Sequence, residues 1–243
     1  MPIYLGSDLV TPYIGSDAVK EIYLGSTLVY QNMPPYTSGM DVWLDGIKNT
    51  SGGHSNSTPT WADLSGNNNN ATVVFGSGDS WSSDSANISS DSTKITVPLN
   101  LYTSSFTVEF VVKLSSLYNY GTLMRGVQSN GTRDAWITSG GNIVLRVASS
   151  YDTSSTAVSI SALNTIAFVV SGNTEKYYLN GTLIGTYSRT VSAASNTSFR
   201  VFADSSTANR HIKGQAYSFR HYSSALTDAQ IRRNRAVDVN RFL

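Results

Sequence analysis

The chain has 243 residues, a formal net charge of +1 and no cysteine, and only 14% of its residues are charged. Such a balance gives no broad attraction for nucleic acid or anionic membrane, so neither is expected as a partner. The missing cysteines exclude disulfides, and no stretch approaches the roughly 18 apolar residues of a membrane span. The N-terminus also lacks the features of a secretory signal. Abundant Ser, Thr, Asn and Gly, with 14 tyrosines, are typical of an all-β protein.

A repeat occupies residues 1–32. The pattern Tyr-x-Gly-Ser-x-x-Val occurs at Tyr4–Val10, Tyr13–Val19 and Tyr23–Val29, and Gly-Ser suits a two-residue type II′ turn. This predicts a four-stranded β-meander. A sheet of about 30 residues has little core of its own, so we expect it to attach to the main domain, to identical copies or to a foreign surface. The alternative is a β-arm without a partner.

The next boundary lies at two prolines. Pro34 and Pro35 favour an extended, stiff connector. We therefore assign residues 1–32 to an attachment segment, 33–40 to a linker and 41–243 to the main domain.

A stretch rich in turn residues opens the main domain. Trp43 and Trp61 can each bury a large ring, while Asp63, Ser65 and the run 66–70 are expected to satisfy turns through side-chain-to-backbone hydrogen bonds. His54 lies in the polar loop between them, and we expect it to bond that loop's backbone. Ligand contact and metal binding are the alternatives for this histidine.

Alternating apolar runs with turn signals follow to the end of the chain. They predict a two-sheet antiparallel β-sandwich, with strands at 94–99, 106–114, 121–126, 134–138, 142–147, 164–170, 175–179, 182–187, 198–203 and 214–222. Thr227 and Gln230 have capping-box spacing, which predicts a short C-terminal helix. Its arginines Arg232, Arg233 and Arg235 indicate a solvated basic face, or a docking face for an acidic partner.

Three segments carry a family resemblance: Trp61–Ala71, Tyr177–Gly185 and Gly214–Ile231. They resemble the motifs of laminin G-like, concanavalin A-like jelly rolls, particularly those of phage virion and bacterial surface proteins. The Ile22–Tyr30 hairpin is similar to modules of phage tail and virion proteins. The resemblance implies a two-sheet jelly roll for residues 41–243.

Catalysis is not expected. The superfamily's glycosidases place several carboxylates on one strand face, and retaining hydrolysis needs two about 5–5.5 Å apart. On the matching strand, Glu109 stands alone, because Val111 and Lys113 occupy the next positions on its face. The histidines also lack metal-binding spacing.

A sugar site needs an aromatic platform beside amides, carboxylates and guanidinium groups. Two predicted loop regions combine these types, and the candidate ligand-binding residues are Tyr120, Arg125, Arg133, Asp134, Trp136, Asp204, Asn209 and Arg210. Laminin G-like domains, which this chain resembles, often hold calcium at such a rim, so the resemblance implies calcium as a candidate cofactor here. No other cofactor is expected. The alternative is that Trp136 belongs to the core and that the loops only face solvent.

The functional hypothesis is a non-enzymatic phage virion protein, a head or tail fibre or decoration, assembled in the host cytoplasm. Residues 1–32 would bind other virion proteins, copies would form a homo-oligomer such as a trimer, and the jelly roll would contact a glycan. The alternative is an adhesion module of a bacterial surface or secreted protein.

Overall fold

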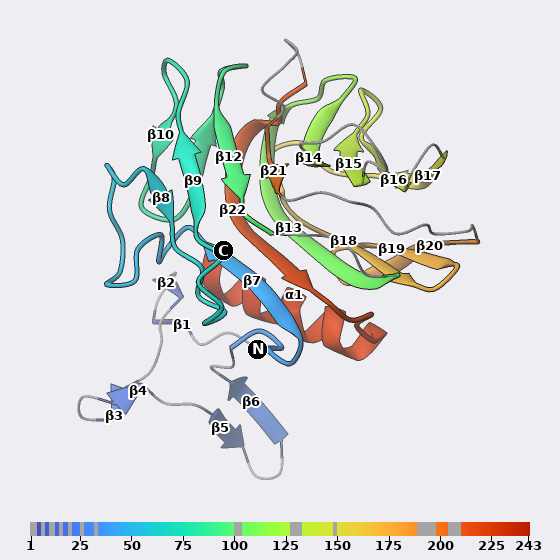
Figure 1. The fold of residues 1–243 in the computed structure, drawn as a ribbon. Coiled ribbons are helices and arrows are strands. Elements are labelled where there is room, and N and C mark those ends of the chain that lie inside the picture. Colours follow the sequence, from blue (N-terminus) through green and yellow to red (C-terminus); the bar gives the residue numbers. More distant parts are fainter. Residues whose placement is uncertain are drawn as a thin grey trace.

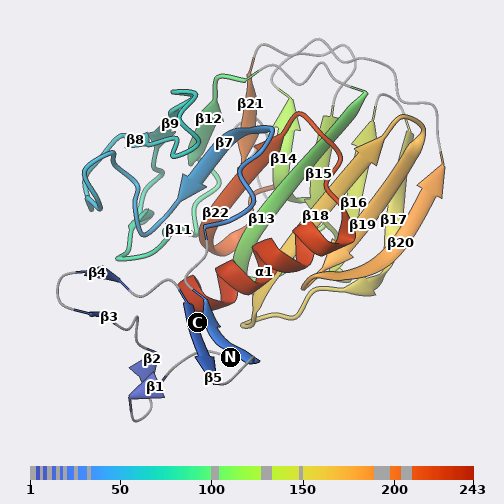
Figure 2. The same cartoon turned by 90° about the horizontal axis from the view of Figure 1, so that it is seen from below.

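The computed structural model describes residues 34–99, 104–126, 133–147, 150–188, 198–203 and 210–243, together with short strands within 4–31. Two antiparallel eight-stranded sheets lie face to face (Figure 1). One C-terminal helix, α1 (Asp228–Phe242), runs across the outer face of one sheet (Figure 2). The predicted β-sandwich and C-terminal helix are therefore confirmed.

We call the sheet beneath α1 the helix-side sheet and the other the opposite sheet. The helix-side sheet has the order β10 (Ser80–Trp81), β11 (Ala86–Ile88), β22 (Lys213–Tyr222), β13 (Ser105–Ser116), β18 (Leu163–Ser171), β19 (Thr174–Leu179), β20 (Thr182–Ser188), and β7 (Met40–Asp45) also pairs with β22. The opposite sheet has the order β17 (Ser150–Ala157), β16 (Asn142–Val147), β15 (Arg133–Ile137), β14 (Gly121–Gly126), β21 (Phe199–Val201), β12 (Lys94–Val97), β9 (Ala71–Val74), β8 (Thr60–Trp61).

Strand alternation sorts side chains between the two faces of each sheet. On β13, Val108, Phe110 and Val112 enter the core between the sheets. Val111 instead packs with Phe242 of α1 on the outer face. Strand β13 is therefore covered on both faces, which explains its nearly continuous apolar run.

Aromatic rings fill the centre of the sandwich. Trp61 is fully buried, and its ring lies 5.0 Å edge-on from Trp81 and 6.2 Å in a stack from Phe202. Such pairs contribute beyond their buried area. The expectation that Trp61 buries its ring is confirmed, whereas Trp43 is only half-buried.

Asp63 holds the entry of the main domain in place through its carboxylate. Asp63 accepts hydrogen bonds from the backbone N–H groups of Trp43 (2.9 Å), Ser65 (2.9 Å) and Asn69 (2.9 Å). Its own N–H donates to Asn70 Oδ1 at 2.8 Å. The turn is thus satisfied by side chains, as the sequence predicts.

The N-terminal repeat forms three hairpins. Strands pair on either side of each Gly-Ser: β1 (Tyr4–Leu5) with β2 (Asp8–Leu9), β3 (Tyr13–Ile14) with β4 (Asp17–Ala18), β5 (Glu21–Leu24) with β6 (Thr27–Gln31). The three turn positions match the prediction, but the described strands of 4–31 form three separate two-stranded ladders and not the single four-stranded meander that was predicted. Among the described strands of 4–31 no ladder joins one hairpin to the next, because the pairing in the first two stays within two residues of the turn.

The segment assigned to a linker is packed where the structure describes it. The Tyr36 N–H donates to Asn234 Oδ1 of α1 at 2.7 Å, and the Tyr222 hydroxyl donates to Tyr36 O at 2.9 Å. Pro35 and Met40 are buried. The chain therefore enters the sandwich along α1 at a fixed place.

Helix α1 begins as its sequence predicts. The Thr227 hydroxyl accepts the Gln230 N–H at 3.3 Å, and the Gln230 side chain accepts the Thr227 N–H at 2.7 Å, which completes the capping box. The helix has 15 residues. In the part of the chain that the structure describes, no helix is both long and apolar enough to cross a membrane.

A buried charge network attaches α1 to the helix-side sheet. Arg220 of β22 donates through Nε to Glu109 at 2.9 Å and through Nη2 to Asp238 of α1. Asn234 Nδ2 donates to the same Glu109 oxygen at 2.7 Å. Burial raises the pKa of both Glu109 and Asp238, and attraction to Arg220 offsets this only in part.

Replacing Arg220 by Met tests this network. Both carboxylates would stay buried without their cation, so we expect the free energy of unfolding to fall by about 3–5 kcal/mol, measured by urea denaturation at pH 7. The exposed Arg232 of the same helix gives a matched control, and Arg232→Met should change it by less than about 0.5 kcal/mol. Equal losses in the two variants would contradict the role of Arg220.

The free energy of unfolding that is lost in Arg220→Met, called the deficit below, should depend on pH in one direction. Because the folded-state pKa of each acid lies above its ordinary value, protonation favours the folded state, and stability is lost as pH rises through the raised pKa. The deficit of Arg220→Met should therefore shrink as pH falls from 7 toward 5. A deficit that grows in acid would show that the carboxylates are not the destabilising groups.

Candidate functional site

Several of the predicted binding residues lie on the outer face of the opposite sheet. Strand register places Arg125 of β14 opposite Asp134 of β15, Asp134 opposite Arg146 of β16, and Arg146 opposite Tyr151 of β17. Their chain neighbours, such as Ala135, point into the core. A row of polar and aromatic side chains therefore crosses four strands on the side away from α1.

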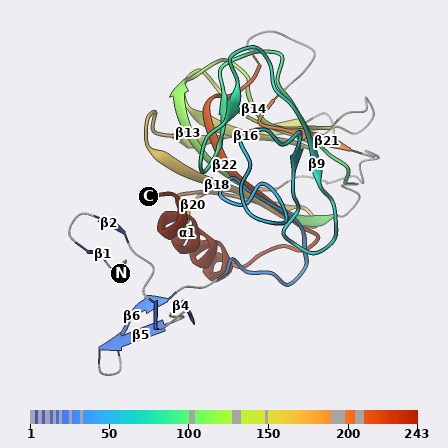
Figure 3. The same cartoon turned by 90° about the vertical axis from the view of Figure 1, so that its left-hand side faces the viewer.

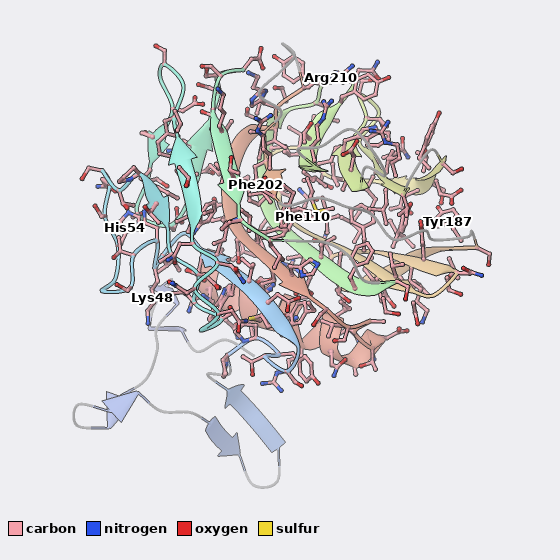
Figure 4. All side chains as sticks on the ribbon, in the orientation of Figure 1. Lys48, His54, Phe110, Tyr187, Phe202 and Arg210 are labelled. Carbon is pink, nitrogen blue, oxygen red and sulfur yellow. The ribbon has the colours of Figure 1, made fainter. Side chains whose placement is uncertain are left out.

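A hollow of about 140 Å³ opens over this row. It is lined by Tyr120, Thr122, Met124, Arg125, Asp134, Ala135, Trp136, Arg146 and Arg210. Five of the eight predicted residues thus share one site: Tyr120, Arg125, Asp134, Trp136 and Arg210. Figure 4 shows Arg210 at the end of the molecule away from α1.

Three aromatic rings form a continuous surface beside the hollow. The Trp136 ring centroid lies 6.0 Å from that of Tyr120 and 5.8 Å from that of Tyr151. Tyr120 is 43% exposed and Tyr151 is 60% exposed. The Arg210 guanidinium lies 4.8 Å from the Tyr120 ring centroid, a cation–π contact that keeps a positive charge at the rim. The half-buried Trp136 is therefore not a core residue.

Asp134 departs from the expectation of an exposed loop. It lies in β15 and is buried, with its carboxylate paired to Arg146 and accepting the Gly126 N–H at 3.2 Å. Burial raises its pKa, whereas Arg146 and Arg125 act to lower it. The strand predicted at 134–138 is present as β15. Only the expectation that the Asp134 side chain is exposed in a loop was wrong, because it alternates with core residues in that strand and is covered.

The remaining predicted residues cannot be placed in the site. Arg133 belongs to β15, but its side chain lies outside the described residues, as do Asp204 and Asn209 altogether. Arg146 and Tyr151 were missed by sequence reasoning. Arg146 lies in a correctly predicted strand, and its alternation with Leu145 and Val147 was a usable signal for an outward position. Only the strand register reveals that it faces Asp134.

The candidate residue His54 lies outside this hollow. His54 Nδ1 lies 2.8 Å from Gly46 O and its Nε2 lies 2.8 Å from Asn56 Oδ1, so this side chain bonds the loop backbone as predicted. In the described ranges, no group of three or more His, Cys, Asp or Glu could hold a metal ion. The candidate binding residue Asp204 is outside those ranges.

The fold and this concave face define a lectin-like jelly roll. A family model described as the concanavalin A-like lectin/glucanases superfamily, Laminin_G_3, matches residues 87–232. The chain belongs to this family. A search of curated proteins finds no match.

Solved structures share the fold at low sequence identity. The chain is similar to Trypanosoma rangeli sialidase in complex with sialic acid (TM-score 0.68, 12% identity, 93% of this chain and 37% of that one). It is also similar to domain 4 of a GH43 extracellular arabinanase from Geobacillus stearothermophilus in complex with arabinotriose (TM-score 0.57, 17% identity, 79% and 96%). The binding domain of botulinum neurotoxin serotype D is a third (TM-score 0.59, 20% identity, 81% and 51%). The chain spans little more than a third of the sialidase.

A pair of tryptophans tests the placement of the aromatic surface. Trp136→Ala should lower the free energy of unfolding by about 1 kcal/mol, because its ring is half-buried at the surface. Trp61→Ala should cost about 3–5 kcal/mol, because its ring is enclosed in the core. Chemical denaturation measures both. Comparable losses would mean that Trp136 is a core residue after all.

Proposed function

We propose that this chain is a non-enzymatic phage virion protein, a head or tail fibre or decoration, that binds a glycan in the hollow on its opposite sheet. The observation that carries the proposal is the half-exposed surface of Tyr120, Trp136 and Tyr151 beside Asp134 and Arg146.

The chemistry of the surface suits a sugar. A pyranose or furanose ring presents apolar C–H faces that stack on aromatic rings, and hydroxyl groups at its edge. Here the aromatic rings of Trp136 and Tyr120 adjoin guanidinium donors from Arg146 and Arg210. The buried carboxylate of Asp134 pairs with Arg146 and holds that donor in place. Known proteins of the same fold support the proposal, since the arabinanase domain is in complex with arabinotriose.

The location of Glu109 supports a non-enzymatic role. In the glycosidases of this superfamily, catalysis needs carboxylates that reach the substrate. Glu109 is 5% exposed, lies under α1 and already binds Arg220 and Asn234. A Glu109→Gln variant should therefore leave any polysaccharide turnover unchanged. Loss of a measurable hydrolase activity in that variant would overturn the non-enzymatic assignment.

Attachment through residues 1–32 is the second part of the proposal. The three Gly-Ser hairpins have two to five residues per strand, which is too little for a stable sheet without a partner. Other virion proteins and further copies of the chain, in a homo-oligomer such as a trimer, would supply that partner. The alternative is an adhesion module of a bacterial surface or secreted protein, which would bind the same glycan without a particle.

A glycan array tests the binding site. The full chain should bind at least one glycan, with or without calcium, and Trp136→Ala should abolish the signal. Trp43→Ala gives a matched control, because Trp43 is also half-buried but lies in β7 of the helix-side sheet. Equal loss in both variants, or no bound glycan at all, would refute the proposed site.

Deletion of residues 1–32 tests attachment. Because Asp63 and the Tyr36–Asn234 contact stay intact, the truncated chain should unfold at the same temperature as the full chain. It should also sediment as a monomer and no longer join its parent particle. A truncated chain that still assembles would move the attachment surface to the jelly roll.

A further inference from the structure

We infer that the aromatic surface of Tyr120, Trp136 and Tyr151 binds three consecutive units of a single, twisted polysaccharide chain, and that it rejects the flat ribbons of a crystalline polysaccharide. The inference rests on the proposed glycan-binding function and specifies the shape and the length of its ligand. It depends on the tilt of the three rings, on their spacing and exposure, and on the strands that carry them.

Neighbouring rings of this surface are turned away from one another. The ring planes of Tyr120 and Trp136 make an angle of 47°, and those of Trp136 and Tyr151 make an angle of 59°. A sugar stacks with an apolar C–H face against an aromatic ring. In a flat ribbon all sugar faces share one plane, so the ribbon cannot stack on two neighbouring rings at once. A chain whose successive units rotate about its axis can present a face to each ring.

The spacing of the rings matches adjacent sugars in one chain. The centroid of Trp136 lies 6.0 Å from that of Tyr120 and 5.8 Å from that of Tyr151. Both distances are comparable to the length of one sugar unit within a polysaccharide. Each ring can therefore serve one unit, and the three rings define three adjacent subsites.

The two outer rings are accessible to a ligand. Tyr120 and Tyr151 are the only aromatic side chains among the large apolar residues that are exposed in the described part of the chain, and both belong to this surface. A cluster of exposed apolar rings is a mark of a binding site. The Arg210 guanidinium already lies over one face of Tyr120, so a sugar must use the remaining exposed side of that ring. Tyr151, which is 60% exposed, is the more open end.

The strands carry the rings from the interior of the opposite sheet to its edge. Tyr120 directly precedes β14, Trp136 lies in β15, and Tyr151 lies in β17, the edge strand. Arg146 of β16 lies opposite Tyr151 in the register, and its side chain is 35% exposed, which places a donor for sugar hydroxyl groups near the outer ring. A chain that crosses the strands therefore meets the three rings in turn. Beyond Tyr151 it leaves the sheet, so a fourth unit gains no further described ring.

A ladder of oligomers tests the length and the shape of the ligand. For each polysaccharide that the glycan array identifies, calorimetry measures the affinity of its oligomers of one to five units. The affinity should rise with each unit up to three and then stay level, because only three rings are present. Microcrystalline cellulose and chitin, whose chains are flat ribbons, should retain none of the full chain in a pull-down assay.

A tyrosine series assigns the outer subsite. Tyr151→Ala should weaken binding of the three-unit oligomer by about three- to ten-fold, and the gain from two units to three should disappear. Tyr151→Phe should bind as the parent does, because it keeps the ring. Tyr118→Ala is the control, since the Tyr118 ring contacts Lys213 of the helix-side sheet, and it should also bind as the parent does. A gain that persists in Tyr151→Ala would contradict the three-ring site.

The outcomes separate the inference from the proposed function. A single sugar unit that binds as tightly as the three-unit oligomer would show recognition of a chain end, which overturns the inference and leaves the proposed function intact. Retention on cellulose or chitin that Trp136→Ala removes would do the same, because it would show that a flat ribbon fits the rings. If no glycan binds in any of these assays, the proposed function fails, and the inference fails with it.

Discussion

The buried guanidinium of Arg220 makes the contacts on which the packing of α1 against the helix-side sheet depends. It joins β13 through Glu109 and α1 through Asp238, and Asn234 carries the connection on to Tyr36 at the start of the jelly roll. Two acids share one cation in a dry environment, so the network is costly to disrupt. Its geometry determines where the helix lies and where the chain enters the sandwich.

That network also explains why the two sheets differ. The outer face of the helix-side sheet is closed by α1 and by apolar contacts such as Val111 with Phe242, which leaves Glu109 no access to a substrate. Among the residues that the structure describes, no helix covers the outer face of the opposite sheet (Figure 3). Polar side chains such as Asp134 and Arg146 can therefore alternate with core residues there and form a surface that is partly open.

Local chemistry in the sequence predicts most of the elements. The strands at 175–179 and 182–187, the Thr227–Gln230 capping box and the Asp63 turn appear in the structure as expected, because each depends on neighbours in the chain. Strand β17 was missed, since its Ser- and Thr-rich run lacks clear alternation. Long-range pairings, such as Arg220 with Asp238 or Asp134 with Arg146, depend on register and on helix docking, which no local pattern contains. The pairing of one N-terminal hairpin with the next also depends on register, so the local sequence pattern does not predict it.

The chain enters the jelly roll beside α1, while the hollow lies on the far side of both sheets (Figure 4). Copies fixed to a common support by their N-termini would therefore all turn their hollows outward. On a polymer with repeated sugar units, attachment by one copy raises the effective concentration of its neighbours' sites, so overall avidity can exceed single-site affinity by about 10²–10⁴. Under the proposed function, a weak single site would then be sufficient for firm but reversible adhesion.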